Sequence, residues 1–156
     1  MKSNLSADPD YNLWVLLHQA RDAIFRARDK ELSQYGITTM QSAVLFIITA
    51  LGGEATATEI SRWLSREPHS VSGLLARMER EGLVRKVKDL VKKSQVNVTL
   101  TAKGRQAHSE SLKRESLRGI MSCLTEEERQ QLVSSLKQLR DKALGSLTKV
   151  RKLPFP

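Results

Sequence analysis

Two short helical patterns followed by an alternating pattern constrain the fold of this chain more than any other feature. Thr56-Ala-Thr-Glu59 has the spacing of a capping box, in which each side chain accepts a hydrogen bond from the other residue's backbone N–H, so a helix is expected to begin here. Pro68 is a residue favoured in a first helical turn, and Gly82 is suited to end a helix. The spacing predicts a short helix through 60–64, a tight turn and a helix over 68–81, which is a helix-turn-helix pattern.

After Gly82 the apolar period changes from helical to alternating. Val96, Val98 and Leu100 alternate with polar residues, which is typical of a half-buried strand. Pairing residues 83–88 with 95–101 gives a two-stranded hairpin with its tip at 89–94. An isolated hairpin is marginally stable in water, so we expect this one to pack against the helices.

The N-terminal part of the chain is predicted to be helical. Apolar residues recur at three- and four-residue spacings over 11–35, and Gly36 is expected to end this helix. A second helix is expected to begin after Thr38 or Thr39 and to end at the glycines 52 and 53. It is apolar on more than one face, which indicates a central position.

The C-terminal part is also predicted to be helical. Thr101 can cap one helix, whose apolar residues are Leu112, Leu117, Ile120 and Leu124. Thr125-Glu-Glu-Glu128 is a second capping box, which begins a last helix. The last helix carries an apolar stripe: Leu132, Leu136, Leu139, Ala143 and Leu147. The basic tail 149–156 is expected to be loose.

Composition supports a mainly α (α+β) chain that forms one compact domain. The chain has 156 residues, of which 40% are hydrophobic and 28% charged, an ordinary mixture for a globular protein. No run of 18 apolar residues is present, the N-terminus lacks the apolar region of a signal peptide, and the single cysteine, Cys123, cannot build a disulfide framework. We therefore expect a cytoplasmic protein.

Positive charge is concentrated in the middle of the chain. The formal net charge is +9, and residues 62–105 contain eleven Lys and Arg against four Asp and Glu, a local balance of +7. Such a field attracts a polyanion, which releases its counterions on binding. The alternative is a surface that only keeps the protein soluble.

Several segments together resemble the MarR family of bacterial transcription regulators. They are Ile37-Thr-Thr-Met-Gln41, Thr58-Glu-Ile-Ser61, Val71-Ser72, Arg77-Met-Glu-Arg-Glu-Gly-Leu-Val84, Leu100-Thr-Ala-Lys-Gly-Arg105 and Leu124-Thr-Glu-Glu-Glu-Arg129. The resemblance spans about residues 11–147 and implies a winged helix-turn-helix homodimer that straddles a roughly palindromic operator near the nucleoid. It also implies a repressor that a small aromatic or phenolic effector releases from DNA.

The resemblance divides the chain into functional parts. It implies an N-terminal dimerisation helix at 1–36, a DNA-binding region at 37–104 with its wing at 83–101, and C-terminal dimerisation helices at 105–148. Residues expected at the dimer contact are Leu13, Leu17, Leu132, Leu136 and Leu139. The alternative for the C-terminal stripe is that it covers the chain's own core.

The wing departs from the family pattern. Family wings commonly carry Asp-x-Arg-Arg, in which the acid supports an arginine that enters the minor groove, whereas this chain reads Val91-Lys92-Lys93-Ser94. Lysine is a strongly hydrated point charge and suits a narrow groove less well than planar arginine. The wing residues Lys92, Lys93 and Ser94 are therefore predicted to grip phosphate more than they read groove width.

The helix over 68–81 is predicted to enter the major groove with its N-terminal residues against base edges. His69, Ser70 and Gly73 lie at that end. Phosphate contacts are predicted for Ser72, Arg77, Thr56, Thr58, Arg62 and Arg66. The alternative for the serines is an ordinary helix surface, and for Arg77 and Arg80 it is a solvated charge facing Glu79 or Glu81.

Other sites have weaker support. Leu17, Phe25 and Met40 are candidates for an effector pocket, with core packing as the alternative for each. Cys123 has no resolving partner, so a buried, inert thiol is expected. The three histidines lack the spacing of metal ligands, and we expect no metal or cofactor.

Two rival functions differ in class from a DNA-binding regulator. An enzyme is disfavoured because the chain has no glycine-rich phosphate loop, nucleophile elbow or recognisable pair of catalytic carboxylates. A winged helix that binds protein or RNA, with the basic surface incidental, is the second rival. Strong salt dependence of duplex binding would separate this module from a regulator.

Overall fold

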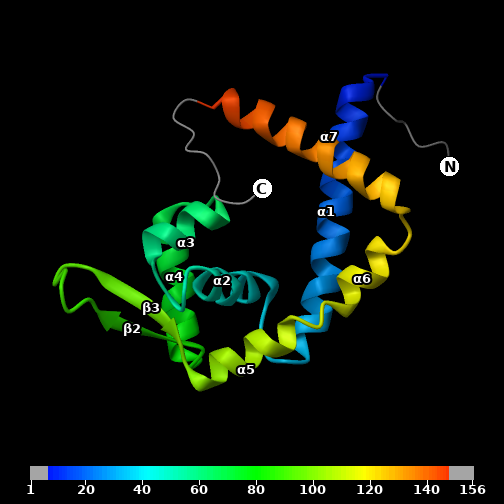
Figure 1. Cartoon of the computed structure of the whole chain (residues 1–156). Coiled ribbons are helices and arrows are strands. Elements are labelled where there is room, and N and C mark those ends of the chain that lie inside the picture. The colour runs from blue at the N-terminus through cyan, green and yellow to red at the C-terminus, as the bar shows by residue number, and fades with distance from the viewer. Residues whose placement is uncertain (1–6, 148–156) are drawn as a thin grey trace.

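The computed structural model describes residues 7–147 and has a mainly α fold with a small antiparallel sheet (Figure 1). The elements in chain order are α1 (Pro9–Ser33), α2 (Thr39–Ala50), β1 (Glu54–Thr56), α3 (Ala57–Leu64), α4 (Pro68–Arg80), β2 (Val84–Lys88), β3 (Val96–Leu100), α5 (Ala102–Ser111), α6 (Glu115–Met121) and α7 (Glu126–Gly145). The mainly α fold class is confirmed. The tail 149–156, predicted to be loose, lies outside the described residues.

Threonine side chains begin four of the helices. Thr38, Thr56 and Thr125 form complete capping boxes at the starts of α2, α3 and α7, and Thr101 accepts a hydrogen bond from the backbone N–H of Gly104 at the start of α5. These starts follow from local sequence, because a capping side chain acts within three residues of its own position. The predicted helix starts are therefore confirmed.

The sheet contains one strand more than the sequence analysis predicted. The hairpin of β2 and β3 forms as expected, with Val84 opposite Leu100, but β1 also pairs with β3 and places Ala55 opposite Val98. The strand order is β1-β3-β2. A strand of three residues has too short an alternation to be recognised in the sequence.

The segment after the wing forms two helices, so the prediction of a single helix there was wrong. Arg114 has a φ of 50° and breaks the helical path between α5 and α6. The Glu31 carboxylate of α1 accepts hydrogen bonds from the backbone N–H groups of Glu115 (2.8 Å) and Ser116 (3.2 Å). The first turn of α6 is thus capped by a residue from α1, a long-range contact that local sequence does not reveal.

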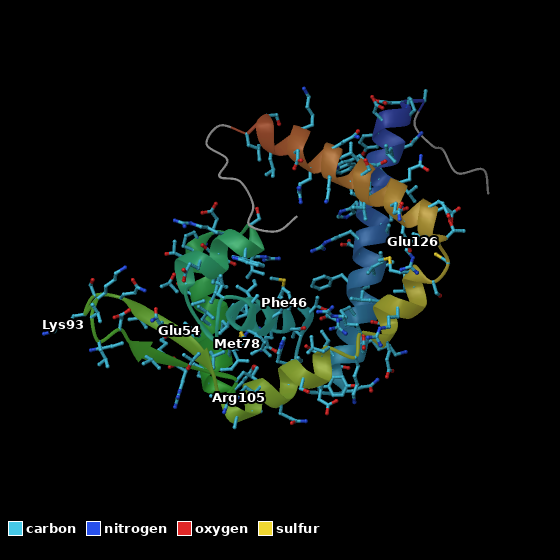
Figure 2. All side chains as sticks on the ribbon, in the orientation of Figure 1. Phe46, Glu54, Met78, Lys93, Arg105 and Glu126 are labelled. Carbon is cyan, nitrogen blue, oxygen red and sulfur yellow. The ribbon has the colours of Figure 1, made fainter. Side chains whose placement is uncertain are left out.

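The core lies between α2, the helix-turn-helix, the sheet and the neighbouring ends of α1 and α5. Its fully buried side chains include Leu32, Leu45, Ile48, Ile60, Leu75 and Met78. Side chains from α2 and α4 point into this region, where Met78 is seen in Figure 2. A side chain at Gly104 would place its Cβ 2.0 Å from the carbonyl oxygen of Leu83, so glycine allows α5 to lie directly against the base of the wing.

Cys123 is exposed, and the expectation of a buried thiol was wrong. The residue follows the end of α6 at Met121 and precedes the start of α7 at Glu126, so it lies in a connecting turn rather than in a packed helix. Among the helices described for residues 7–147, none combines the length and the apolar character needed to cross a membrane.

Candidate nucleic-acid interface

Helix α4 is anchored by one face and presents the other to solvent. Val71, Leu75 and Met78 are buried in the core. The Gln41 amide of α2 donates a hydrogen bond of 2.5 Å to the carboxylate of Glu81 at the C-terminal end of α4. Exposed residues on the other face are His69, Ser70, Ser72, Gly73 and Arg77. The structure therefore brings the five predicted recognition-helix residues to one solvent-exposed surface.

A hollow beside α4 gathers three of the predicted DNA-contacting residues. Arg66 from the turn and Ser70 and Arg77 from α4 line a cavity of about 280 Å³. The turn itself contains Ser65 at a φ of 51°, and its backbone N–H bonds the carbonyl of Arg62, so the chain reverses tightly before Pro68. Asp29 of α1 also lines the hollow, and its carboxylate accepts a hydrogen bond of 2.7 Å from the backbone N–H of Thr39. The hollow therefore combines two guanidinium groups with one carboxylate.

The acids near α4 do not neutralise its arginines. Glu79 pairs with Lys86 of the wing at 3.4 Å between Oε2 and Nζ, and Glu81 accepts the hydrogen bond from Gln41. Within residues 7–147, neither Arg77 nor Arg80 forms an ion pair. The alternative that these arginines face Glu79 or Glu81 therefore finds no support in the geometry.

Two of the predicted phosphate-binding hydroxyls are used within the protein. The Ser72 hydroxyl donates to the carbonyl of Pro68 at 3.0 Å, and the Thr56 hydroxyl donates to the carboxylate of Glu59 at 2.9 Å. Each would have to give up that bond in order to donate to a phosphate. Thr58 and Arg62 of α3 are exposed. Their role as phosphate contacts remains a prediction.

The wing tip holds Lys92, Lys93 and Ser94 in solvent, and Lys93 marks its far end in Figure 2. The turn is organised by Asp89, which the sequence analysis missed: its carboxylate accepts hydrogen bonds of 2.8 Å from the backbone N–H groups of Val91 and Lys92. These bonds lower the pKa of Asp89. An aspartate two or three residues before the donating amides is the local signal that would have predicted this turn.

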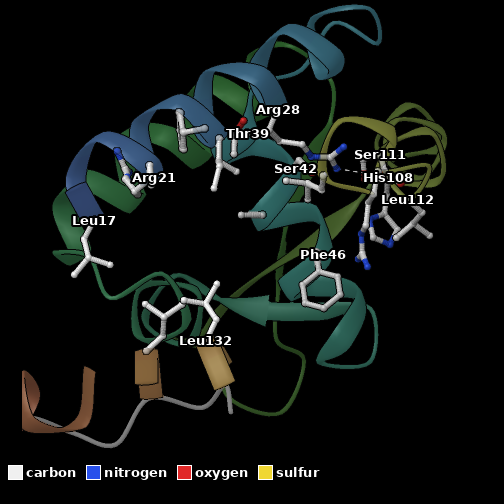
Figure 3. Close-up of a pocket in the computed structure, with 17 residues that line it drawn as sticks. Leu17, Arg21, Arg28, Thr39, Ser42, Phe46, His108, Ser111, Leu112 and Leu132 are labelled. Carbon is white, nitrogen blue, oxygen red and sulfur yellow. Dashed lines mark hydrogen bonds between the residues drawn. The ribbon is translucent and has the colours of Figure 1, made fainter. Parts of the chain in front are cut away.

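A larger pocket of about 770 Å³ lies between the winged region and the terminal helices (Figure 3). Leu17 and Phe25 of α1 line it, as predicted, together with Phe46 of α2 and Leu132 and Leu136 of α7. Met40 does not line this pocket; it lies in the smaller hollow beside α4 because it is in the first turn of α2, on the side that faces Arg66 and Ser70. Met40 and Leu17 therefore line different cavities, while Phe25 lines both.

The polar residues of the large pocket were not found from the sequence. Arg28 is buried and already paired: it donates to the Glu31 carboxylate (2.8 Å) and to the carbonyl of Ser111 (2.6 Å), the bond dashed in Figure 3. The Thr39 hydroxyl and His108 Nδ1 are buried without a hydrogen-bond partner among the described residues. Thr39 and His108 come from α2 and α5, so only the fold places them together.

The electrostatics of the pocket favour a neutral or anionic guest. Arg21, Arg28, Arg114 and His108 line it, and no acidic side chain does so within the described part of the chain. Burial lowers the pKa of His108, and the positive charge of Arg114 lowers it further. His108 is therefore biased toward its neutral form, which can donate one hydrogen bond and accept another.

The first half of α1 and the whole of α7 carry apolar side chains that the chain itself does not cover. Leu13 is 49% exposed and Leu139 is 46% exposed, while Leu132 and Leu136 are each 42% exposed. No residue of α7 is buried. The alternative in which the α7 stripe covers the chain's own core is therefore not what the structure shows.

Comparison with known proteins places this architecture in a family. The family model described as MarR family matches residues 35–93. The HTH-type transcriptional regulator TtmR of Methylorubrum extorquens (strain PA1) is 30% identical over 142 residues, which cover 85% of this chain and 67% of TtmR.

Solved structures agree with this assignment. The organohalide-sensing transcriptional regulator RdhR-CbdbA1625, in its 2,4-dichlorophenol-bound form, is 31% identical, with a TM-score of 0.84 over 100% of this chain and 97% of the other. A mutant of MarR from E. coli, complexed with operator DNA, is 25% identical, with a TM-score of 0.76 over 81% of this chain and 92% of the other. TtmR and RdhR-CbdbA1625 are both transcriptional regulators. The helix-turn-helix, the wing and the similarity to these relatives show that the chain belongs to the MarR family of transcription regulators.

Proposed function

We propose that this regulator binds an operator in double-stranded DNA as a homodimer and represses transcription until a small ligand releases it. The observation that carries the proposal is the exposed basic surface of α4 and the wing, where Arg77, Arg80, Lys92 and Lys93 form no ion pair within residues 7–147. The wing projects away from α1 (Figure 1). The similarity to MarR from E. coli complexed with operator DNA supports it. The proposed place of action is the cytoplasm, at the nucleoid.

The N-terminal end of α4 would read bases. A helix fits the major groove with its first residues toward base edges, and His69, Ser70 and Gly73 are exposed there. Arg77, Arg66 and the α3 residues Thr58 and Arg62 would contact phosphates, which fix the register without carrying sequence information.

The wing would act as a second phosphate contact. Lys92, Lys93 and Ser94 lie on a turn that Asp89 closes, so their backbone positions are fixed before DNA arrives. Replacing both lysines by Ala is expected to weaken binding to all sequences similarly. A selective loss at one operator would contradict this role.

The proposed dimer joins the α1 and α7 surfaces of two chains. Exposed apolar residues that gather on one helix face can mark an interaction site. Leu132, Leu136 and Leu139 of α7 recur at helical spacing, and Leu13 of α1 is exposed as well. Residues 1–36 and 105–148 would then form the dimer region and residues 37–104 the DNA-binding region. A two-fold dimer reads half-sites about one helical turn apart on a roughly palindromic operator.

The proposed effector is a small aromatic or phenolic molecule in the large pocket. RdhR-CbdbA1625 has been solved with 2,4-dichlorophenol, and the pocket here has apolar walls that include Leu17, Phe25 and Phe46, together with the polar residues Thr39 and His108. Helices of the dimer region and of the DNA-binding region both line the pocket. A ligand that favours one arrangement of these two parts would shift the population away from the DNA-binding state.

Selection of bound duplexes from a random pool tests the proposal. We expect one enriched inverted repeat, whose affinity falls by orders of magnitude between about 50 and 200 mM salt. His69→Ala is expected to change sequence preference, and Arg77→Ala to reduce affinity for every duplex. Absence of duplex binding at low salt would refute the proposal, and partner binding that changes little with salt would favour the protein-binding module.

A further inference from the structure

The wing tip exposes two apolar side chains almost completely. Leu90 is 94% exposed and Val91 is 90% exposed, the highest values among the large hydrophobic residues found exposed in the described chain. Val87 and Val96 behind them, on the two strands of the wing, are 40% and 43% exposed. These residues lie far from the dimer surface of α1 and α7, so the proposed dimer does not explain them (Figure 1).

The turn fixes these side chains outward. The Asp89 carboxylate accepts from the backbone N–H groups of Val91 and Lys92, the Asp89 N–H donates to the carbonyl of Gln95 (3.0 Å), and the Gln95 N–H donates to the carbonyl of Lys92 (2.7 Å). Four hydrogen bonds therefore close a turn of seven residues. An apolar pair held in water by an ordered turn is prepared to be buried against a partner.

The charges around the pair indicate what kind of partner fits. Lys88, Lys92 and Lys93 flank Leu90 and Val91 in the chain, and none of the three forms an ion pair within residues 7–147. The nearby acid, Asp89, is occupied by backbone N–H groups. The tip thus combines an apolar centre with a cationic rim.

The minor groove of B-form DNA has the complementary arrangement. Phosphates line its two edges, while deoxyribose carbons form its walls, and apolar side chains such as Leu are known to enter it. The wing and α4 lie at the same end of the molecule, so a duplex held by α4 lies within reach of the tip (Figure 1).

We propose that Leu90 and Val91 enter the minor groove beside the base pairs read by α4, while the lysines hold the phosphates at its edges. This inference rests on the proposed DNA-binding function and adds a sequence preference to it. A G·C pair places the guanine N2 amino group on the floor of the minor groove, where an apolar side chain offers it no acceptor. The wing therefore prefers A·T pairs without making any hydrogen bond to a base.

Inosine provides the test, because an inosine·C pair lacks the minor-groove amino group and leaves the major groove of G·C unchanged. Starting from the selected operator, pairs flanking each half-site are changed one at a time to A·T, G·C or inosine·C, and affinity for the full-length protein is measured. We expect G·C under the wing to weaken wild-type binding about tenfold, as burial of an apolar side chain would allow. Inosine·C is expected to restore the affinity.

Variants assign the effect to the apolar pair. Leu90→Ala with Val91→Ala is expected to lose about tenfold in affinity, to bind G·C and inosine·C duplexes equally, and to keep the salt dependence of the wild type. Leu90→Met, which keeps an apolar side chain, is expected to retain the inosine effect. Lys92→Ala with Lys93→Ala is the matched control: it should lower the salt slope by roughly one for each lysine–phosphate interaction that it removes, and it should keep the inosine effect.

The outcomes separate this inference from the function on which it rests. If the wild type binds no duplex at low salt, the proposed function fails. If it binds its operator but G·C and inosine·C are equivalent at every flanking pair, or if the Leu90 and Val91 variant binds like the wild type, only the wing inference is overturned. Binding of the tip to anionic lipid vesicles, lost in the same variant without any change in operator affinity, would also overturn it.

Discussion

The winged region and the terminal helices use apolar residues in opposite ways. In the winged region, Leu45, Ile60, Leu75 and Met78 are almost completely buried, and the chain supplies all of their contacts itself. On α7, no residue is buried, although the helix begins with the same kind of capping box as α3.

The two regions therefore depend on different partners for their stability. Helix α3 is stabilised by packing against its own chain, whereas α7 keeps leucines such as Leu139 in solvent at a free-energy cost that burial against a second copy would offset. We therefore infer that the winged region folds as a unit of the single chain and that α7 acquires its full stability in the dimer.

The largest effect is expected from charges on the exposed α7 surface. Leu136→Asp with Leu139→Asp would place carboxylates in the proposed interface, and loss of the second DNA-binding unit should reduce operator affinity by about 100-fold or more. Light scattering should show a monomer, while circular dichroism should show a folded winged region. Ser135→Asp, also exposed on α7, is the matched control, and an unchanged dimer in the double variant would contradict the proposed interface.

A cavity in the winged core should cost stability at any protein concentration. Leu45→Ala removes a fully buried side chain and is expected to lower the free energy of unfolding by about 2–5 kcal/mol in urea titrations. Leu139→Ala is the comparison: its effect should depend on protein concentration and vanish below the dissociation constant of the dimer. Equal, concentration-independent losses at both positions would remove the contrast.

The buried Glu31 carboxylate, which pairs with Arg28 and accepts hydrogen bonds from the first turn of α6, should make stability depend on pH. Burial alone would raise the pKa of Glu31, but hydrogen bonds from Ser116, Arg28 and the backbone of Glu115 outweigh it and lower the pKa from 4.5 to about 2. Since the folded-state pKa is depressed, the stabilisation is complete above pH 4.5 and is lost as the pH falls toward 2.

The Glu31→Gln variant tests this linkage. We expect it to be about 2 kcal/mol less stable than the wild type at pH 7, because the buried Arg28 guanidinium loses its charged partner. The difference should shrink as urea titrations are repeated at lower pH between 4.5 and 2. A difference that does not change over this interval would mean that the carboxylate charge is not what stabilises the contact.

The smallest effects are expected at the helix caps. Thr56→Ala and Thr125→Ala each remove a capping box and should cost about 1 kcal/mol. For Thr56 the loss should appear in the unfolding of the winged region, and for Thr125 it should appear as a weaker dimer in equilibrium sedimentation. If Thr56→Ala weakened the dimer and Thr125→Ala did not, the dependence of α7, rather than α3, on the dimer would be contradicted.

Local signals in the sequence predicted much of the fold. The threonine caps, Gly82 and the alternation of Val98 and Leu100 act within a few residues, so the helix-turn-helix and the hairpin could be located without a structure. The same holds for the exposed face of α4, because burial of Val71, Leu75 and Met78 fixes which side faces solvent.

Features that depend on contacts distant in sequence could not be predicted. The break before α6 is stabilised by Glu31, and the polar atoms of the large pocket come from Thr39 and His108 on different helices. Met40 shows the same limit, because its distance from Leu17 depends on the direction that α2 takes from α1. The exposure of Leu90 and Val91 also requires the geometry of the wing turn.

The mass of the protein bound to its selected operator shows whether two chains pair through α1 and α7 when the winged region binds DNA. Light scattering of the purified complex at low salt should show two 17.6 kDa chains on each duplex, and a duplex with only one half-site should bind far more weakly. One chain per duplex, with equal affinity for duplexes with one and two half-sites, would contradict the proposed dimer region of α1 and α7.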